Sequence, residues 1–161
     1  MKQTIIVSLV LFIAVSGDAV AGCVAEGYPY VRQSRENNVR NLLRNKSVDA
    51  TAPDGENWKE DHCNTAVGSA GNLYKVGDGT AVDPRVLEGT WQAVDINGAA
   101  ANGWRVRYIY AGGLTYTWKV YRNTTGATGG NALGVGICWE DESGNTIAAS
   151  PTTTAITGSC P

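Results

Sequence analysis

Hydrophobic and polar residues alternate most clearly across residues 104–122. A period of two is typical of strands that bury one face, so we predict two strands here. The first carries large residues at every second position of 104–110, and the second does so across 114–120. Residues 111–113, Ala-Gly-Gly, form the predicted loop of a hairpin between them.

The length of this loop decides which side chains share a face. A loop of the two glycines alone would turn the two apolar sets to opposite sides of the sheet. A loop of residues 111–113 instead pairs Tyr108 with Tyr116 and Val106 with Trp118. We predict the longer loop because a slip of one residue inverts every side chain, and we expect Tyr108, Tyr116 and Trp118 to be buried together. Glycine adopts the left-handed conformations that such loops need.

The opposite face of the hairpin is basic. The predicted register places Arg105 opposite Lys119, and like charges that face each other across a ladder destabilise it. We expect Arg105, Arg107 and Lys119 to be exposed, where charge guards a strand edge against aggregation. A second interpretation is that these cations, together with Tyr121, form a platform that binds an anionic ligand.

The rest of the chain predicts one helix and several short strands. The helix covers residues 34–44, with Ser34 as its cap and an apolar stripe of Val39, Leu42 and Leu43. The other predicted strands cover residues 46–50, 57–63, 72–76, 89–96, 135–139, 146–149 and 152–156. This spacing indicates a mainly β fold: a small antiparallel β-barrel or β-sandwich with one short N-terminal helix.

Composition adds three limits to this picture. A length of 161 residues suggests one domain. The formal net charge of −2 gives no general reason to expect binding to nucleic acid or to an acidic membrane. We predict no transmembrane segment after the first 22 residues, because no later apolar run is long enough to cross a bilayer.

Residues 1–21 are predicted to be a signal peptide. Lys2 supplies a positive start, and residues 5–15 form a short apolar run. Residues 19–21, Ala-Val-Ala, then offer small side chains at the positions that a signal peptidase reads. Cleavage before Gly22 would leave a single exported β domain over residues 22–161, periplasmic or extracellular.

The same junction also fits a lipoprotein signal, in which Cys23 would carry a lipid anchor. We favour ordinary cleavage for two reasons. Asp18 interrupts the apolar run where a lipoprotein signal is usually still apolar. Lipidation of Cys23 would also leave three other cysteines, an odd number in an exported protein.

The four cysteines are Cys23, Cys63, Cys138 and Cys160. They lack the closely spaced pairs of a zinc site, so we predict disulfides and no bound metal. Four cysteines allow three connectivities. We favour Cys138–Cys160, which would close a terminal hairpin, together with Cys23–Cys63.

Two side chains of the 57–63 strand are candidates for a binding site. His62 is the only histidine, and Glu60 shares its predicted face, as an acid–base pair would require. No third metal ligand or nucleophile motif accompanies the pair, so we favour a structural or surface histidine and assign no catalytic residue and no cofactor. The five tryptophans are predicted mainly to be core residues, but one or two, such as Trp58, could face a ligand.

A series of short motifs carries a family resemblance. In chain order these are Leu42-Leu43 with Val48, Gly55 with Trp58 and His62, Gly71 with Leu73-Tyr74, Asp83-Pro84, Gly89-Thr90-Trp91, the Tyr-rich hairpin and a late pair of cysteines. Across about residues 42–140 the order resembles small exported proteobacterial proteins of unassigned function. The resemblance implies a calycin-like β-meander, similar to a small lipocalin-type barrel, and it implies no activity.

The sequence therefore predicts an exported bacterial β domain that acts as a binding or surface-interaction module for a small ligand, a glycan or a protein partner. One alternative is a structural subunit of an extracellular assembly. Another is a hydrolase or enzyme inhibitor that uses the His62 region. We favour binding over catalysis because the His62 region lacks a nucleophile.

Overall fold

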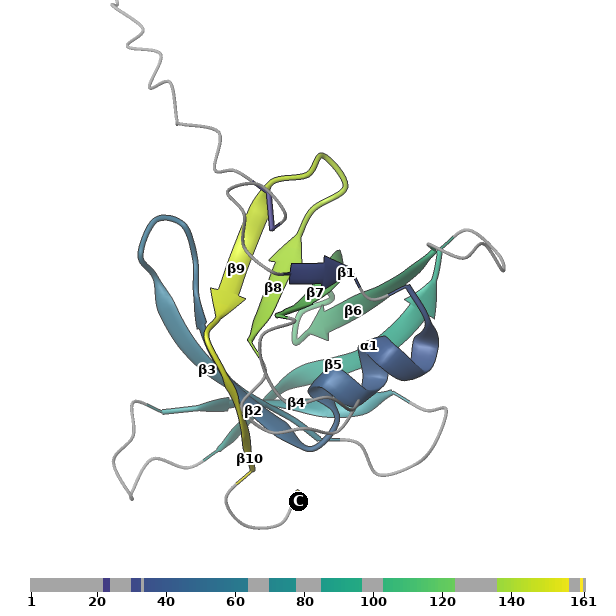
Figure 1. Ribbon diagram of the computed structural model, residues 1–161. Helices are drawn as coiled ribbons and strands as arrows, with labels where there is room; N and C mark the ends of the chain where they lie inside the picture. Colours follow the sequence, from purple (N-terminus) through teal and green to yellow (C-terminus); the bar gives the residue numbers. More distant parts are fainter. Residues whose placement is uncertain are drawn as a thin grey trace, which may run out of the picture.

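The computed structural model of the chain describes residues 22–23, 30–32, 34–63, 70–77, 85–96, 103–123, 136–156 and 160. The predicted signal peptide lies outside the described residues. The described residues form ten strands and one helix, which are labelled in Figure 1. In chain order they are β1 (Tyr30–Arg32), α1 (Glu36–Leu43), β2 (Lys46–Thr51), β3 (Asn57–His62), β4 (Gly71–Val76), β5 (Val86–Asp95), β6 (Trp104–Tyr110), β7 (Thr115–Asn123), β8 (Ile137–Glu140), β9 (Thr146–Ser150) and β10 (Thr153–Ala155).

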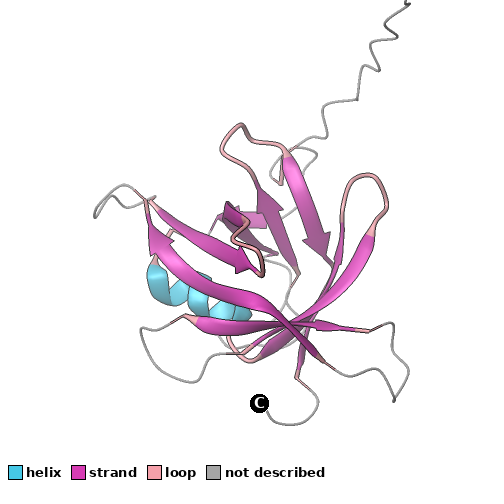
Figure 2. Ribbon diagram, turned by 180° about the vertical axis from the view of Figure 1, so that it is seen from behind, coloured by secondary structure: helices cyan, strands magenta, loops and turns pink. Residues whose placement is uncertain are grey.

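Strands β2 to β9 form a closed antiparallel barrel of eight strands (Figure 2). Each strand pairs with the next one along the chain, and β9 pairs back with β2 through Ala149 and Thr51. Closure leaves no free edge among these strands. The mainly β prediction is confirmed, and of its two alternatives the barrel is correct.

The predicted hairpin register is confirmed. Strands β6 and β7 pair Tyr108 with Tyr116 and Val106 with Trp118. The loop has three residues, and the Tyr110 amide donates to the Leu114 carbonyl at 2.9 Å. The two loop glycines have φ angles of 90° and 87°, a region that residues with a Cβ rarely adopt.

Helix α1 fills the end of the barrel at which β2 begins. Its apolar stripe is buried as predicted, because Val39, Leu42 and Leu43 belong to the same core cluster as the inward side chains of the strands. The helix packs against β5 and β6 (Figure 1). The prediction of Ser34 as the cap is wrong: Arg35 holds the N-cap position and makes no side-chain capping bond.

The centre of the barrel is filled by large side chains. Trp91, Tyr108 and Trp139 are all buried there. An eight-stranded barrel has an interior just wide enough for side chains or one small ligand. Here side chains occupy the centre.

Two disulfides join Cys23 to Cys138 and Cys63 to Cys160. The cysteine set was predicted correctly, but the favoured pairing was wrong. Strand β10 runs along β2, pairing Ala155 with Lys46, and so leads the C-terminus toward the end of β3 and Cys63. Each disulfide therefore joins segments that closure of the barrel brings together, and neither joins the two strands of one hairpin.

The N-terminal bridge lies against β7 and β8. Cys23 packs with Tyr121 and Cys138 in a small buried cluster. Its sulfur is bonded to Cys138 and so is not free to carry the thioether of a lipoprotein. No helix among the described residues is long and apolar enough to cross a membrane.

Candidate functional site

A pocket of about 380 Å³ opens at the end of the barrel opposite α1. We call it the mouth. The turn between β2 and β3 borders it, and strands β3 to β7 supply the rest of its wall. The mouth is lined by Glu56, Trp58, Glu60, Lys75, Glu88, Tyr110, Tyr116 and Trp118.

Strand alternation explains why these residues meet. On β3, the residues at 58, 60 and 62 share one face, and the pairing of β2 to β9 into a ring turns that face inward. On β6 and β7, the predicted register places Tyr110 and Tyr116 near the hairpin loop, and so at the same end of the barrel. The mouth is therefore built by closure from residues that lie far apart in the sequence.

Aromatic rings form one wall of the mouth, with one pair inclined steeply and one pair stacked. Tyr110 and Tyr116 meet edge to face, with ring centroids 5.9 Å apart and planes at 73°. Tyr116 then stacks on Trp118 at 5.4 Å. Tyr116 was predicted to be buried, but it is 43% exposed, because its strand position lies at the open rim. Its ring is therefore available to a ligand.

Glu60 is the buried carboxylate of the mouth. Only 6% of the residue is exposed, and its Oε1 accepts a hydrogen bond from the Tyr110 hydroxyl at 3.0 Å. Burial raises the pKa of Glu60 to about 7, and the negative charge of Glu88 adds to this rise. Hydrogen bonds from Tyr110 and Trp58 and the charge of Lys75 oppose it, and burial also raises the pKa of Tyr110.

His62 lies deeper than the mouth and is fully buried. The Trp139 indole N–H donates to the Tyr108 oxygen at 3.1 Å, which leaves the Tyr108 hydroxyl hydrogen for Nε2 of His62, also at 3.1 Å. Burial lowers the pKa of His62 to about 3, so the ring is neutral near neutral pH. These hydrogen bonds link β3, β6 and β8 within the core. The buried side chain of His62 is not accessible to a ligand.

The neighbouring acid does not supply an acid–base pair either. Asp61 points away from the barrel interior, and its carboxylate pairs with Arg85 at 2.6 Å. Within the described residues no group of three or more His, Cys, Asp or Glu side chains could hold a metal ion. The arrangement around His62 therefore offers no support for the alternative of a hydrolase.

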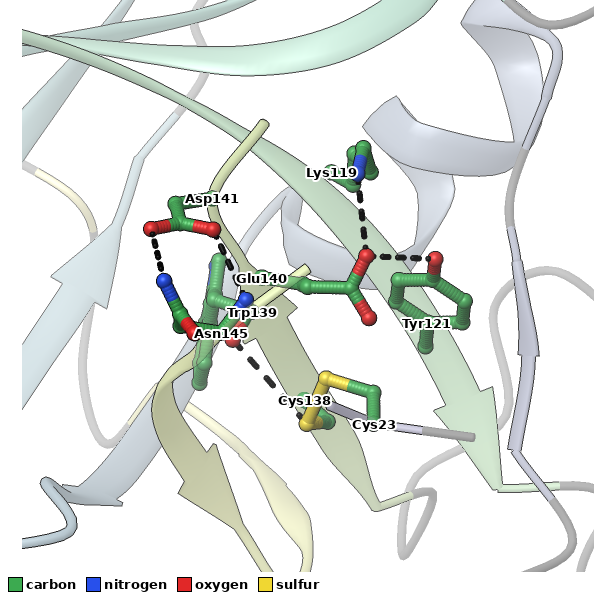
Figure 3. The surroundings of a disulfide bond; sticks show 8 residues. All are labelled: Cys23, Lys119, Tyr121, Cys138, Trp139, Glu140, Asp141 and Asn145. Atoms are coloured by element: carbon green, nitrogen blue, oxygen red, sulfur yellow. Dashed lines mark hydrogen bonds and ion pairs between the residues drawn. A yellow bond between two sulfur atoms is a disulfide. The ribbon is translucent and has the colours of Figure 1, made fainter. Parts of the chain in front are cut away.

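The predicted basic platform is neutralised by acids. Arg105 Nε lies 2.6 Å from Oε1 of Glu142, and Lys119 Nζ lies 3.0 Å from Oε1 of Glu140. Tyr121 donates to the same Glu140 oxygen at 3.0 Å, beside the Cys23–Cys138 disulfide (Figure 3). We call these five residues, Arg105, Lys119, Tyr121, Glu140 and Glu142, the outer ion cluster.

The expected exposure of this face was wrong. Arg105 is only 4% exposed, and the Lys119 side chain 13%. Arg107 is half-buried and pairs across the sheet with Gln92 and Thr117, apart from the cluster. The two cations that were expected to repel each other each have a carboxylate partner, because Glu140 at the end of β8 and Glu142 in the following turn lie on the same face. The interactions of the cluster are structural.

Of the six candidate ligand residues predicted from sequence, only Trp58 lines the mouth. Reasoning from sequence missed Glu60 as a ligand residue in its own right, and it missed Glu88 and Lys75 altogether. The available signal was the position of Tyr110 and Tyr116 beside a short hairpin loop, which puts aromatic rings at the rim of any closed barrel.

Comparisons with protein-family models, curated proteins and solved structures found no match to this chain. The resemblance to small exported proteobacterial proteins therefore stays a prediction.

Proposed function

We propose that this protein is a binding module that takes one small ligand into the mouth of its barrel. The observation that carries the proposal is a pocket of about 380 Å³ that combines aromatic walls with one buried carboxylate. Ligand sites in proteins are typically concave, mostly apolar, and equipped with a few polar groups that fix orientation. The mouth is concave and combines four aromatic rings with four charged side chains that can fix the orientation of a ligand.

Rigidity supports the same assignment. Tyr110 and Trp118 of the mouth pack against Tyr108, which is hydrogen-bonded to His62 and Trp139. Two disulfides cross-link the chain over sequence separations of 115 and 97 residues. A site whose walls are fixed before binding loses less conformational entropy when the ligand enters.

A nuclear magnetic resonance titration with indole, a neutral planar probe, tests the proposal. The indole N–H signals of Trp58 and Trp118 should shift, because both rings line the mouth. The N–H signals of Trp91 and Trp139 should stay in place, because both groups are buried and bonded in the core. The absence of shifts, or shifts spread over all four signals, would overturn the mouth as a binding site.

Two substitutions on the β6–β7 hairpin form a matched pair. Tyr116→Ala removes an exposed ring from the mouth and should weaken indole binding several-fold. Ile109→Ala removes an exposed side chain from the outer face of the same hairpin and should leave binding unchanged. Equal affinities for the two variants would contradict the proposal.

We also propose that the chain acts outside the cytoplasm, in the periplasm or the extracellular space. Two disulfides are typical of proteins that fold in oxidising compartments. The predicted cleavage before Gly22 supports the same location. N-terminal sequencing of material exported by the source cell should begin at Gly22, and a blocked terminus at Cys23 would contradict the disulfide as well as the cleavage.

A second candidate function is contact with a protein partner. Exposed apolar side chains lie near the mouth: Val86 at 55% and Leu87 at 56% at the start of β5, and Leu114 at 60% just before β7. Exposed apolar side chains that lie together often mark interaction sites. Leu87→Ser combined with Leu114→Ser should abolish any self-association seen by sedimentation, and unchanged association would exclude this rim.

A further inference from the structure

We propose that the ligand of the mouth is an organic cation, a substituted ammonium group held by the aromatic rings and by Glu60. The inference rests on the proposed binding function and adds the chemical class of the ligand. It follows from three features of the described residues: the ring geometry, the balance of charges, and the burial of one carboxylate.

The ring geometry favours a cation. The face of an aromatic ring carries partial negative charge, so rings that surround a ligand attract ammonium groups. Tyr110 and Tyr116 meet at 73°, and Trp118 and Trp58 continue the lining of the same pocket. Rings inclined in this way can contact a rounded ammonium group from several sides, whereas a flat ligand can use only one ring face at a time.

The charge balance of the mouth favours a cation as well. Three carboxylates line the pocket, Glu56, Glu60 and Glu88, against a single ammonium group, that of Lys75. None of these three acids has an ion pair to an arginine or lysine within 4.0 Å among the described residues. Acids that line an open pocket in excess of cations attract positively charged ligands.

The burial of Glu60 makes the mouth selective for cations over neutral ligands. A ligand that enters the mouth removes the remaining water from the carboxylate, and a neutral ligand leaves that charge without compensation. A cation supplies the missing counter-charge at the same moment. The raised pKa of Glu60, about 7, reflects the same removal of the carboxylate from water, which the hydrogen bonds from Tyr110 and Trp58 and the charge of Lys75 offset only in part.

The probes are choline and its uncharged carbon isostere, 3,3-dimethylbutan-1-ol. The two have nearly the same shape, so a difference in affinity reports charge alone. We expect choline to bind about tenfold or more tightly than the isostere at pH 8, measured through the N–H signals of Trp58 and Trp118. The charge of choline does not change with pH, so any pH dependence reports the protein.

Binding of choline should weaken as the pH falls. The cation selects ionised Glu60, so affinity should drop about tenfold per pH unit well below pH 7. The charged or titratable groups that face Glu60 from the neighbouring strands are Lys75 on β4, Glu88 on β5, and Tyr108 and Tyr110 on β6. A profile centred near pH 7 would single out Glu60 among them.

Three variants isolate the role of Glu60. Glu60→Gln keeps the shape of the side chain and should remove both the preference for choline and the pH profile. Glu88→Gln changes another acid of the mouth and should weaken choline binding while the pH profile persists, with a somewhat lower midpoint because the charge of Glu88 adds to the raised pKa of Glu60. Glu36 lies on α1, away from the mouth, so the Glu36→Gln variant should bind choline as the unmodified protein does. Melting curves check that each variant is folded.

The outcomes separate this inference from the proposed function. Equal binding of choline and its isostere would overturn the cation and leave the mouth as a binding site. Binding of indole without binding of choline would do the same. If no probe shifts the signals of Trp58 and Trp118, both proposals fail. A choline preference that survives in Glu60→Gln would show that Glu60 is not the counter-charge.

Discussion

At the scale of single residues, the most informative group is the carboxyl of Glu60. Burial favours its neutral form, so its pKa in the folded protein is about 7, against about 4.5 when the chain is unfolded. A raised folded pKa adds stability below the unfolded pKa, and that stability is lost as the pH rises from about 4.5 through about 7. The buried, ionised Glu60 therefore destabilises the fold at alkaline pH.

Glu60→Gln should remove this loss of stability at alkaline pH. Glutamine resembles the protonated acid and does not titrate, so we expect the variant and the unmodified protein to be equally stable at pH 4. At pH 8 the variant should be more stable by on the order of 2–3 kcal/mol. Urea melts at the two pH values measure the difference, and a gap that does not change with pH would show that Glu60 is not buried as a charge.

Lys119 provides the second prediction at this scale. Its ammonium group is the ionic partner of Glu140, which is only 6% exposed. Lys119→Ala should cost about 1–3 kcal/mol of unfolding free energy, because Glu140 then keeps only the bond from Tyr121. The control is Lys59→Ala, whose contact with Asp49 is long and exposed and should contribute less than about 0.5 kcal/mol.

Denaturant melts of these two variants at pH 7 give both free energies. Similar costs for Lys119→Ala and Lys59→Ala would show that the outer ion cluster adds nothing to stability. The sequence suggested the reverse of this prediction, because it placed Lys119 beside Arg105 and showed no acid nearby. The acids become visible only when the β8–β9 turn is folded against the same face.

Contacts between distant segments also explain which residues of the mouth were predicted from the sequence and which were missed. Trp58 was named as a ligand candidate because one or two of the tryptophans of a β protein can face a ligand. Lys75 and Glu88 border the β4–β5 connection, where no local pattern indicates their direction. Their membership of the site depends on the closure of five strands into one wall, a long-range property that periodicity does not contain.

At the scale of elements, α1 serves as the closed end of the barrel. Leu42 is 2% exposed and belongs to the interior core. Leu42→Ala should cost about 2–5 kcal/mol, because it leaves a cavity between the helix and the strands. Asn38→Ala, on the exposed side of the same helix, should change stability by less than about 0.5 kcal/mol.

Thermal or urea unfolding of both helix variants measures these costs. If Leu42→Ala were as mild as Asn38→Ala, the helix would rest on the barrel without completing its core. Helix propensity does not complicate the comparison, because alanine is the best helix former and favours both variants. The difference between the two therefore reports the buried contact.

Elements whose signals are local were predicted well. The hairpin register followed from alternation and from the two glycines of a three-residue loop, and the apolar stripe of α1 followed from its helical period. The helix cap failed, because Arg35 rather than Ser34 holds the N-cap position. A barrel could not be separated from a sandwich, because β9 and β2 lie far apart in the sequence and pair through one ladder position, Thr51 with Ala149.

At the scale of the whole molecule, the two disulfides overlap along the chain. One spans residues 23–138 and the other spans residues 63–160, so each bridge has one end inside the loop closed by the other. The chain-entropy model assigns roughly 4–5 kcal/mol to a loop of about 100 residues. The bridge between Cys138 and Cys160 that the sequence favoured would close a far shorter loop and stabilise less.

A single substitution distinguishes the two pairings. In the structure, Cys63→Ser leaves Cys160 without a partner, whereas the pairing favoured from sequence would leave Cys23 free. We expect alkylation of the folded variant, followed by peptide mapping without reduction, to label Cys160 and to recover Cys23 linked to Cys138. Label on Cys23 would mean that β10 does not run along β2 toward the end of β3, and the closure of the barrel at that seam would be wrong.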